Sequence, residues 1–311
     1  MNFRTNPLLL TTLRAAALTV SMATIAHADT VTVEHAMGST DLLETPTRIV
    51  TLYQGATDAA VALGITPVGV VESWAEKPMY HYLRDELDGV AQVGLETQPN
   101  LEEIARLNPD LIIGAKMRHE KVYNQLSQIA PTVMHETVFM FKETLDLIAE
   151  ATDHESEAAQ WHNDWDTKIA DFQSQVSDQA DLNWPQEVAL LNFRNDHARI
   201  YYSSFAGNIL NELGFERPDA HKEDAWGVKL TSKESIPSMN ADVFFIFMNE
   251  DDNTVLENYA AWTGHPLWNT LDAVKNDQVY RVNETDWNLG GGPIAAERMV
   301  ESVIEHYGLN D

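Results

Sequence analysis

The feature that most constrains the fold is a regular alternation of short apolar segments with helical patterns, which begins at Arg48. Four segments of the first half are short and rich in β-branched residues, as buried strands are: residues 48–52, 67–71, 111–114 and 131–134. Helical patterns lie between them, and the one over residues 100–108 begins with Asn100 as N-cap and Glu103 three residues later, which predicts a capping box. Strands that alternate with helices form a parallel sheet with helices on its faces.

The alternation resumes in the second half of the chain. Strands are predicted at residues 187–193, 199–202, 242–247 and 278–282, and a helix at 293–308. Residues 100–114 and 232–247 share one order of features: a cap residue, a carboxylate, a short apolar helix, an Asn-x-Asp turn and an apolar strand. We therefore predict an α/β fold of two similar lobes, each with a central, mostly parallel sheet.

A long helical segment is predicted between the lobes, from Phe141 to Val176. Its second half carries one apolar stripe on a strongly charged helix, formed by Trp161, Trp165, Ile169, Phe172 and Val176. We interpret this stripe as a surface that packs against both lobes. The predicted organisation is a signal peptide (1–28), an N-terminal lobe (29–140), a linking helix (141–182) and a C-terminal lobe (183–311).

The first residues have the pattern of a secretory signal. Arg4 and Arg14 precede an apolar run over residues 15–25 that is too short to span a bilayer, and "AHA" at 26–28 has the form of a cleavage site. An amphipathic first helix is the alternative. The mature chain is expected to begin near Asp29, and the absence of cysteine excludes disulfides, thiol catalysis and a lipid-modified N-terminal Cys. We expect a free periplasmic protein with no lipid anchor.

The charge of the chain excludes one class of partner. Without the leader and its two arginines, 18 basic and 48 acidic residues remain, a net charge of −30. Nucleic acid binding requires clustered Lys and Arg over a basic face, so nucleic acid is not an expected partner. Most of the carboxylates fit a surface that keeps a protein soluble in salt, and local basic clusters stand out against this background.

Two such clusters follow predicted strands. Lys116 and Arg118 come after the strand at 111–114, and Arg194 and Arg199 lie at the equivalent place after the strand at 187–193. Ligands of open α/β sheets bind beyond the carboxyl ends of the strands. Because the arginine fork holds carboxylates through two hydrogen bonds, the two clusters predict an anionic ligand between the lobes.

Further candidates for the same rim are basic or aromatic, and any one of them alone could be an ordinary surface charge or core ring. They are Lys77, Arg84, Lys229, Tyr53, Trp74, Tyr201, Tyr202 and Trp226. Tyr201 and Tyr202 are expected to point in opposite directions, because side chains alternate along a strand. The segment "NLGGGP" (288–293) places Pro293 at the first turn of the last helix, where either an anion site or a flexible turn is possible.

Metal binding and catalysis have weak signals. Five of the histidines, His35, His119, His135, His197 and His221, are scattered, with neither His-x-x-x-His spacing nor cysteine. The motifs of serine hydrolases, phosphate-binding loops and zinc proteases are absent, so we predict no enzymatic activity. A binding protein for a bare Zn(II) or Mn(II) ion and an extracytoplasmic hydrolase remain as alternatives.

The chain also resembles a known family over nearly all of its mature length. The resemblance is to the periplasmic binding proteins of ABC importers for ferric siderophores, ferric citrate and vitamin B12, nearest to the branch for ferric citrate and citrate-based siderophores. It rests on motifs in the family's order, namely "PTRIVTLYQGATDAAVALGITPVGVVESW", "VGLETQPNLEEIARLNPDLIIGAKMRHEKVYNQLSQIAPTV", "NFRNDHARIYY" and "DAWGVKLTSKESI".

The resemblance implies a class III binding protein with a rigid linking helix, a small hinge movement and no covalently bound cofactor. Its ligand would be an Fe(III)-siderophore chelate whose own oxygens hold the iron. Carried over by motif, Arg118, Arg194 and Arg199 would bind carboxylates, and Tyr53, Trp74, Trp226 and Lys229 would line the cleft.

The resemblance also implies partners. The monomeric protein would deliver its ligand to an inner-membrane ABC permease, whose arginines meet one acidic residue on each lobe. Glu120 matches this place in the first lobe. Asn208 lies at the matching place in the second and departs from the acidic pattern, and Glu212 is the substitute.

Overall fold

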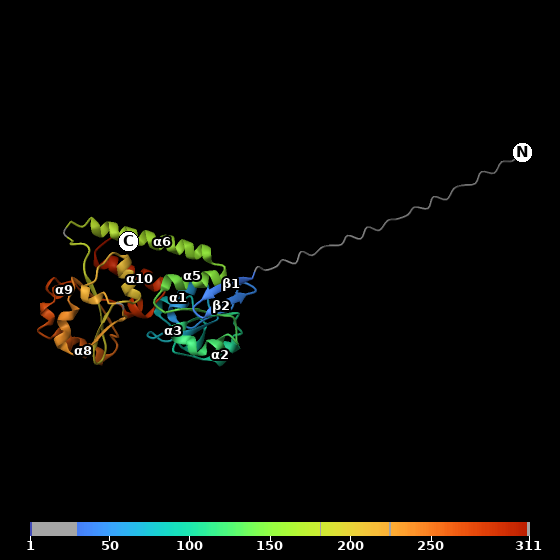
Figure 1. Cartoon of the computed structure of the whole chain (residues 1–311), viewed down its shortest axis with the longest axis horizontal. Coiled ribbons are helices and arrows are strands. Elements are labelled where there is room, and N and C mark those ends of the chain that lie inside the picture. The colour runs from blue at the N-terminus through green and yellow to red at the C-terminus, as the bar shows by residue number, and fades with distance from the viewer. Residues whose placement is uncertain (2–29, 181, 224, 310–311) are drawn as a thin grey trace.

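The computed structural model describes Met1 and residues 30–309, except residues 181 and 224 (Figure 1). The predicted signal peptide beyond Met1 and the predicted mature start at Asp29 lie outside the described residues. Two separate sheets form the centres of two lobes, and a long helix, α6 (Glu155–Ser177), runs along one side of both (Figure 1).

The first lobe is built around a six-stranded sheet. Its strands, in spatial order, are β6 (Gln98–Pro99), β5 (Ala91–Leu95), β4 (Gly69–Glu72), β3 (Ile49–Thr51), β7 (Leu111–Ala115) and β8 (Thr132–His135). All neighbours are parallel except β5 and β6. Every residue of β3 and β7 is buried, as expected for parallel strands covered on both faces. The four strands predicted in this half are therefore confirmed.

The helices of the first lobe are α1 (Gln54–Ala62), α2 (Leu101–Arg106), α3 (Lys116–His119) and α4 (Tyr123–Leu126), with a hairpin of β1 (Val31–His35) and β2 (Gly38–Leu42) beside the sheet. The Asn100 side chain caps α2, because it accepts hydrogen bonds from the backbone N–H groups of Glu102 and Glu103. The second half of the predicted capping box is wrong. The Asn100 N–H donates to the Val93 carbonyl, while the Glu103 carboxylate pairs with Arg106.

The second lobe contains a five-stranded sheet. Its strands, in spatial order, are β11 (Gly227–Leu230), β10 (Ala198–Tyr201), β9 (Val188–Phe193), β12 (Val243–Met248) and β13 (Val279–Arg281). β9, β12 and β13 are parallel, whereas β10 is antiparallel to both of its neighbours. The cause is the tight turn after β9, in which the Arg194 N–H donates to the His197 carbonyl over 2.9 Å. The lobe is completed by α7 (Phe205–Glu212), α8 (Asn253–Thr263), α9 (Asp272–Lys275) and α10 (Pro293–His306).

The helical segment predicted as continuous from Phe141 to Val176 is two helices. The first, α5 (Phe141–Thr152), ends at Asp153, whose φ of 60° lies in the left-handed region, and the His154 N–H bonds back to the Ala149 carbonyl. The α5 helix packs against α1 of the first lobe, so α6 alone links the lobes.

The predicted apolar stripe of α6 is buried along its whole length and contacts both lobes. Trp165 lies 5.3 Å from the ring of Phe141 in α5, and Phe172 lies 6.2 Å from Phe215, which follows α7 in the second lobe. The interpretation of the stripe as a packing surface is therefore confirmed.

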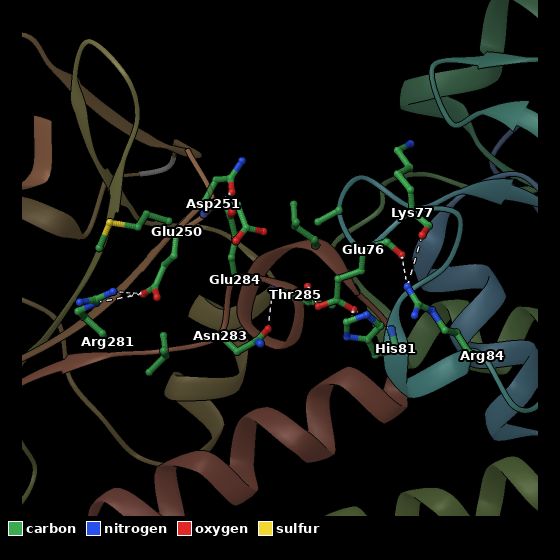
Figure 2. Close-up of a pocket in the computed structure, with 15 residues that line it drawn as sticks. Glu76, Lys77, His81, Arg84, Glu250, Asp251, Arg281, Asn283, Glu284 and Thr285 are labelled. Carbon is green, nitrogen blue, oxygen red and sulfur yellow. Dashed lines mark hydrogen bonds and ion pairs between the residues drawn. The ribbon is translucent and has the colours of Figure 1, made fainter. Parts of the chain in front are cut away.

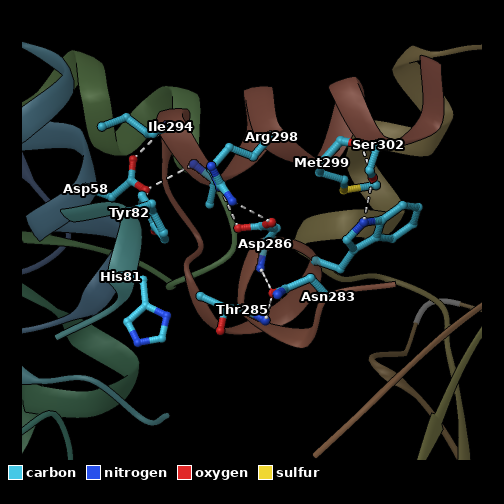
Figure 3. A network of polar contacts seen from close by, with 12 residues as sticks. Asp58, His81, Tyr82, Asn283, Thr285, Asp286, Ile294, Arg298, Met299 and Ser302 are labelled. Carbon is cyan, nitrogen blue, oxygen red and sulfur yellow. Dashed lines mark hydrogen bonds and ion pairs between the residues drawn. The ribbon is translucent and has the colours of Figure 1, made fainter. Parts of the chain in front are cut away.

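The lobes also meet at the N-terminus of α10 (Figure 3). Asp58 of α1 is fully buried, and its carboxylate accepts hydrogen bonds from the backbone N–H groups of Ile294 (2.7 Å) and Ala295 (3.1 Å) and from the Tyr82 hydroxyl (2.7 Å). The anion site considered at this helix end is thus filled by an internal carboxylate. A Cβ on Gly292 would lie 2.4 Å from the Cβ of Asp58, so this close approach requires glycine.

Candidate ligand-binding site

A cavity of about 280 Å³ lies between the lobes, and we call it the central cavity. The first lobe contributes the ends of several strand-to-helix connections, and the second contributes the segments around β10, α7 and β11. The lining includes Tyr53, Gln54, Trp74, Glu96, Arg118, Tyr201, Ser203, Ser204, Trp226 and Asn288. Because the carboxyl ends of parallel strands face this space, it is where an open α/β sheet places a ligand.

A second compartment of about 660 Å³ adjoins the central cavity and shares Leu289 with it (Figure 2). Lys77, His81 and Arg84 line it from the first lobe, and Glu250, Asp251 and Arg281 line it from the second. The two lobes touch here, since the Thr285 hydroxyl donates to the Glu76 carboxylate over 3.2 Å. Its lining carries both positive and negative side chains, whereas four of the predicted aromatic residues, Tyr53, Trp74, Tyr201 and Trp226, line the smaller, central cavity.

Arg118 lies in the first-lobe wall of the central cavity, in the short helix α3 that directly follows β7. Its side chain is 34% exposed, and its Nε donates to the Glu96 carboxylate over 3.1 Å. Glu96 is only 4% exposed, and burial raises its pKa while Arg118 beside it lowers it. The predicted cation therefore already has an internal counterion.

His119, next to Arg118, supports this wall and is fully buried. Its Nδ1 accepts from the Ala115 N–H over 3.0 Å, and its Nε2 donates to the Glu96 carbonyl over 2.8 Å. Burial lowers the pKa of His119, which agrees with a neutral ring. Both ring nitrogens are used, so His119 holds the loop of Glu96 in place.

Two predicted aromatic residues complete the first-lobe wall. Trp74 is 48% exposed, and its indole N–H donates to the Glu96 carboxylate over 3.2 Å. Tyr53 is buried, and its hydroxyl hydrogen-bonds that of Thr144 over 3.0 Å. Trp74 thus offers an open ring face to a ligand, whereas Tyr53 closes the wall from behind.

Trp226 lines the second-lobe side of the central cavity, and Arg199 lies next to it without being one of the lining residues. The Arg199 guanidinium lies 5.6 Å from the centre of the Trp226 ring, which is itself 48% exposed, and Arg199 Nε donates to His197 Nε2 over 3.0 Å. His197 Nδ1 in turn hydrogen-bonds the Asp196 carboxylate. Among the described residues, Arg199 forms no ion pair with a carboxylate.

Lys229 stands directly opposite Arg199 in the β10–β11 pair, so two cations lie side by side. The Lys229 Nζ is 3.9 Å from the exposed carboxylate of Asp196. The Nη1 of Arg194 lies 3.5 Å from Glu284, a residue of the second compartment. Burial raises the pKa of Glu284 and Arg194 lowers it, so Arg194 also has an internal counterion.

Like Arg194, Arg199 and Lys229, three further predicted site residues are absent from the lining of the central cavity. Lys116 pairs with Glu136 over 3.0 Å, and Lys77 pairs with Glu72 over 3.1 Å, both away from the central cavity. Tyr202 is buried and stacks on His221, with 5.5 Å between ring centres. The predicted alternation of the tyrosine pair is seen, but Tyr201 lines the cavity, so the prediction that Tyr202 does is wrong.

The two predicted docking carboxylates differ in their surroundings. Glu120 is exposed at the start of η2 (Glu120–Val122). Glu212 accepts hydrogen bonds from Lys142 (2.6 Å) and the indole N–H of Trp165 (2.8 Å), which ties α7 to α5 and α6. Since Glu212 holds the packing of the linking helix, it does not fit the predicted docking role.

Neither Glu96 nor Glu284 was identified from the sequence, because the chain has 48 acidic residues and these two do not stand out among them. Glu96 comes directly after the strand β5 and so lies at the ligand edge of the sheet, but β5 has no clear strand pattern in the sequence. Within the described part of the chain, no three His, Asp or Glu side chains gather in a way that could hold a metal ion. Nor does any helix there have the length and apolar content needed to cross a membrane.

Comparison with known proteins identifies the family. The model of the periplasmic binding protein family matches residues 49–285, which include both central sheets and all of the lining of the central cavity except residues 288–291. The chain belongs to the periplasmic binding protein family. This agrees with the resemblance inferred from the motifs, and relatives of the chain are named as binding proteins rather than enzymes.

Individual members of the family are similar over most of their length. The achromobactin-binding periplasmic protein of Dickeya dadantii is 44% identical, over 85% of this chain and 87% of the relative. The probable siderophore-binding lipoprotein YfiY of Bacillus subtilis is 40% identical, over 91% of this chain and 89% of the relative. The crystal structure of Staphylococcus aureus SirA complexed with staphyloferrin B superposes with a TM-score of 0.86 at 44% identity, over 90% and 99% of the two chains. The predicted fold class is thereby confirmed.

Proposed function

We propose that this protein is the solute-binding component of an ABC importer and that it captures an anionic Fe(III)-siderophore chelate containing carboxylates in the central cavity. The observation that carries the proposal is a cation near a half-exposed indole ring on each side of the cavity: Arg118 and Trp74 share the Glu96 carboxylate, and Arg199 lies 5.6 Å from the ring of Trp226. Proteins named for binding achromobactin, staphyloferrin B and Fe(3+)-citrate are among its relatives, which supports the ligand class.

The chemistry of the cavity suits such a ligand. A siderophore holds Fe(III) with its own oxygens, so the protein need bind only the outer face of the chelate. Guanidinium groups bind its free carboxylates and flat rings cover its apolar parts. Arg118 and Arg194 each form an ion pair with a buried glutamate of the protein. Among these cations, Arg199 and Lys229 are therefore the least neutralised, and we expect the ligand's negative charge to lie near them.

Delivery of the ligand completes the proposed role. We propose that the exposed Glu120 contacts the permease and that the protein acts as a monomer in the periplasm without a lipid anchor. We also propose that the second lobe begins at residue 183, as predicted, whereas the linking helix begins at Glu155, because α5 packs on the first lobe. A directly coordinated metal ion is a less favoured ligand, because the described residues form no cluster of metal ligands.

A fluorescence titration tests this proposal. Trp74 and Trp226 are both half exposed at the cavity, so a bound ferric chelate should quench tryptophan emission. We expect saturable quenching by ferric citrate or ferric staphyloferrin B, and none by a ferric catecholate chelate or free Zn(II). A response to Zn(II) alone would favour the metal-ion alternative, and a response to the catecholate alone would contradict the carboxylate assignment.

A further inference from the structure

Glu96 has a set of contacts that an ordinary buried carboxylate lacks. Its two oxygens accept hydrogen bonds from Arg118 Nε (3.1 Å), from the Trp74 indole N–H (3.2 Å) and from the backbone N–H of Gln54 (3.3 Å). Its own carbonyl is held by His119. The residue is therefore fixed through both its side chain and its backbone.

The groups that Glu96 binds come from separate segments. Trp74 follows β4, Gln54 begins α1 after β3, and Arg118 follows β7, while Glu96 itself follows β5. These four strands are neighbours in the first-lobe sheet. One carboxylate thus connects the ends of four neighbouring strands that contribute to the first-lobe wall of the central cavity.

The contact with Arg118 determines which of its donors a ligand can reach. A guanidinium has five N–H groups in a fixed plane, and Glu96 takes the one on Nε. Within the described residues, the Nη groups of Arg118 form no hydrogen bond, and the side chain is 34% exposed. Nε therefore faces Glu96, and the outer fork is left for a carboxylate of the ligand.

The carboxylate charge of Glu96 suits this positioning role. Burial raises its pKa, but the neighbouring cation and three donors favour the ionised form that all of these hydrogen bonds require. A glutamine could accept from Arg118 with its amide oxygen, yet its amide nitrogen would then meet the donors of Trp74 and Gln54. The arrangement is therefore specific for a carboxylate.

We propose that Glu96 is a positioning residue that fixes Arg118 and Trp74 relative to each other, and so selects chelates that present a carboxylate beside a flat or apolar group. This inference rests on the proposed function, since it concerns how the same cavity recognises its ligand. Glu96 acts through Arg118 and does not itself contact the ligand.

A double-mutant cycle on the mature protein tests this role. The dissociation constants for ferric staphyloferrin B and ferric citrate are measured by fluorescence titration for the wild type, Glu96→Gln, Arg118→Ala and the double variant. We expect Glu96→Gln to weaken binding about tenfold or more in the wild-type background, and less than about twofold in the Arg118→Ala background, as for residues that act together. Thermal melting of each variant monitors folding.

Glu136→Gln is the matched control, because it removes the carboxylate partner of Lys116, a partly buried cation of the same helix. It should change the affinity by less than about twofold. Wild-type affinity or tighter binding in Glu96→Gln would overturn the proposal, since Glu96 would then merely compete with the ligand for Arg118. Equal weakening in both backgrounds would also overturn it, because Glu96 would then act on the fold. A wild type that binds neither chelate would overturn the proposed function itself, and this inference with it.

Discussion

The buried carboxylate between the lobes should make the free energy of unfolding depend on pH. Asp58 is fully buried between α1 and the N-terminus of α10, and burial raises its pKa from 3.8 to about 7, although its hydrogen bonds to Tyr82, Ile294 and Ala295 lower it. A group whose pKa is raised by folding contributes stability below its unfolded pKa. That contribution is lost as the pH rises through the folded value.

The magnitude follows from these two pKa values. Between pH 5 and pH 8, titration of Asp58 alone should lower the free energy of unfolding by about 2–3 kcal/mol, because one pKa unit corresponds to about 1.4 kcal/mol. Asp58→Asn removes the titrating group and keeps its size. Relative to the wild type, the variant should therefore become more stable by about 2–3 kcal/mol on going from pH 5 to pH 8.

Urea unfolding of the iron-free protein, followed by circular dichroism, measures this difference. Other groups that titrate in this range, such as the buried His119 and His221, affect both proteins and cancel in the comparison. A constant stability difference across the pH range would refute the reasoning. If the wild type instead gained stability over the variant at pH 8, the helix N-terminus would outweigh burial and keep the carboxylate ionised.

Three further predictions concern the site and the junction of the lobes. Arg199→Ala should weaken binding of ferric staphyloferrin B by about 10- to 100-fold in a fluorescence titration, because charge-assisted hydrogen bonds to the ligand are lost. The melting temperature should stay within a few degrees of the wild-type value. Unchanged affinity would show that Arg199 is not part of the binding site. Gly292→Ala should destabilise the protein by about 2 kcal/mol or more in urea unfolding, because its Cβ would lie 2.4 Å from that of Asp58; wild-type stability would show that this contact relaxes easily. Glu120→Ala should reduce iron uptake by cells without changing the dissociation constant, whereas normal uptake would argue against docking through this residue.

The sequence predicted the parts of the fold that depend on local pattern. Fully buried strands such as β7 and β12 appear as continuous apolar runs, and both were found. β5 and β11 were missed because each buries only one of its residues and so resembles a polar loop. The break between α5 and α6 was also missed, since Asp153 adopts a left-handed conformation in a sequence with neither glycine nor proline nearby.

The residues of the candidate site could be predicted where their positive charge differs from the acidic composition of the rest of the chain. Arg118, Arg194 and Arg199 stand out because they are cations at strand ends in an acidic chain. Their partners Glu96 and Glu284 could not be identified in this way, since only the packing of distant strand ends distinguishes them from other carboxylates. Alternation along β10 predicted that Tyr201 and Tyr202 diverge, but which of them faces the cavity depends on the neighbouring sheet layers.

A crystal structure of the mature protein with ferric staphyloferrin B, with iron located by anomalous scattering, tests the central claim most directly. The account predicts iron in the central cavity, coordinated by chelate oxygens alone, with ligand carboxylates within hydrogen-bonding distance of Arg118 and Arg199 and with Trp74 and Trp226 against the chelate. Iron coordinated by protein side chains, or a chelate seated between Arg84 and Arg281 in the second compartment, would contradict it.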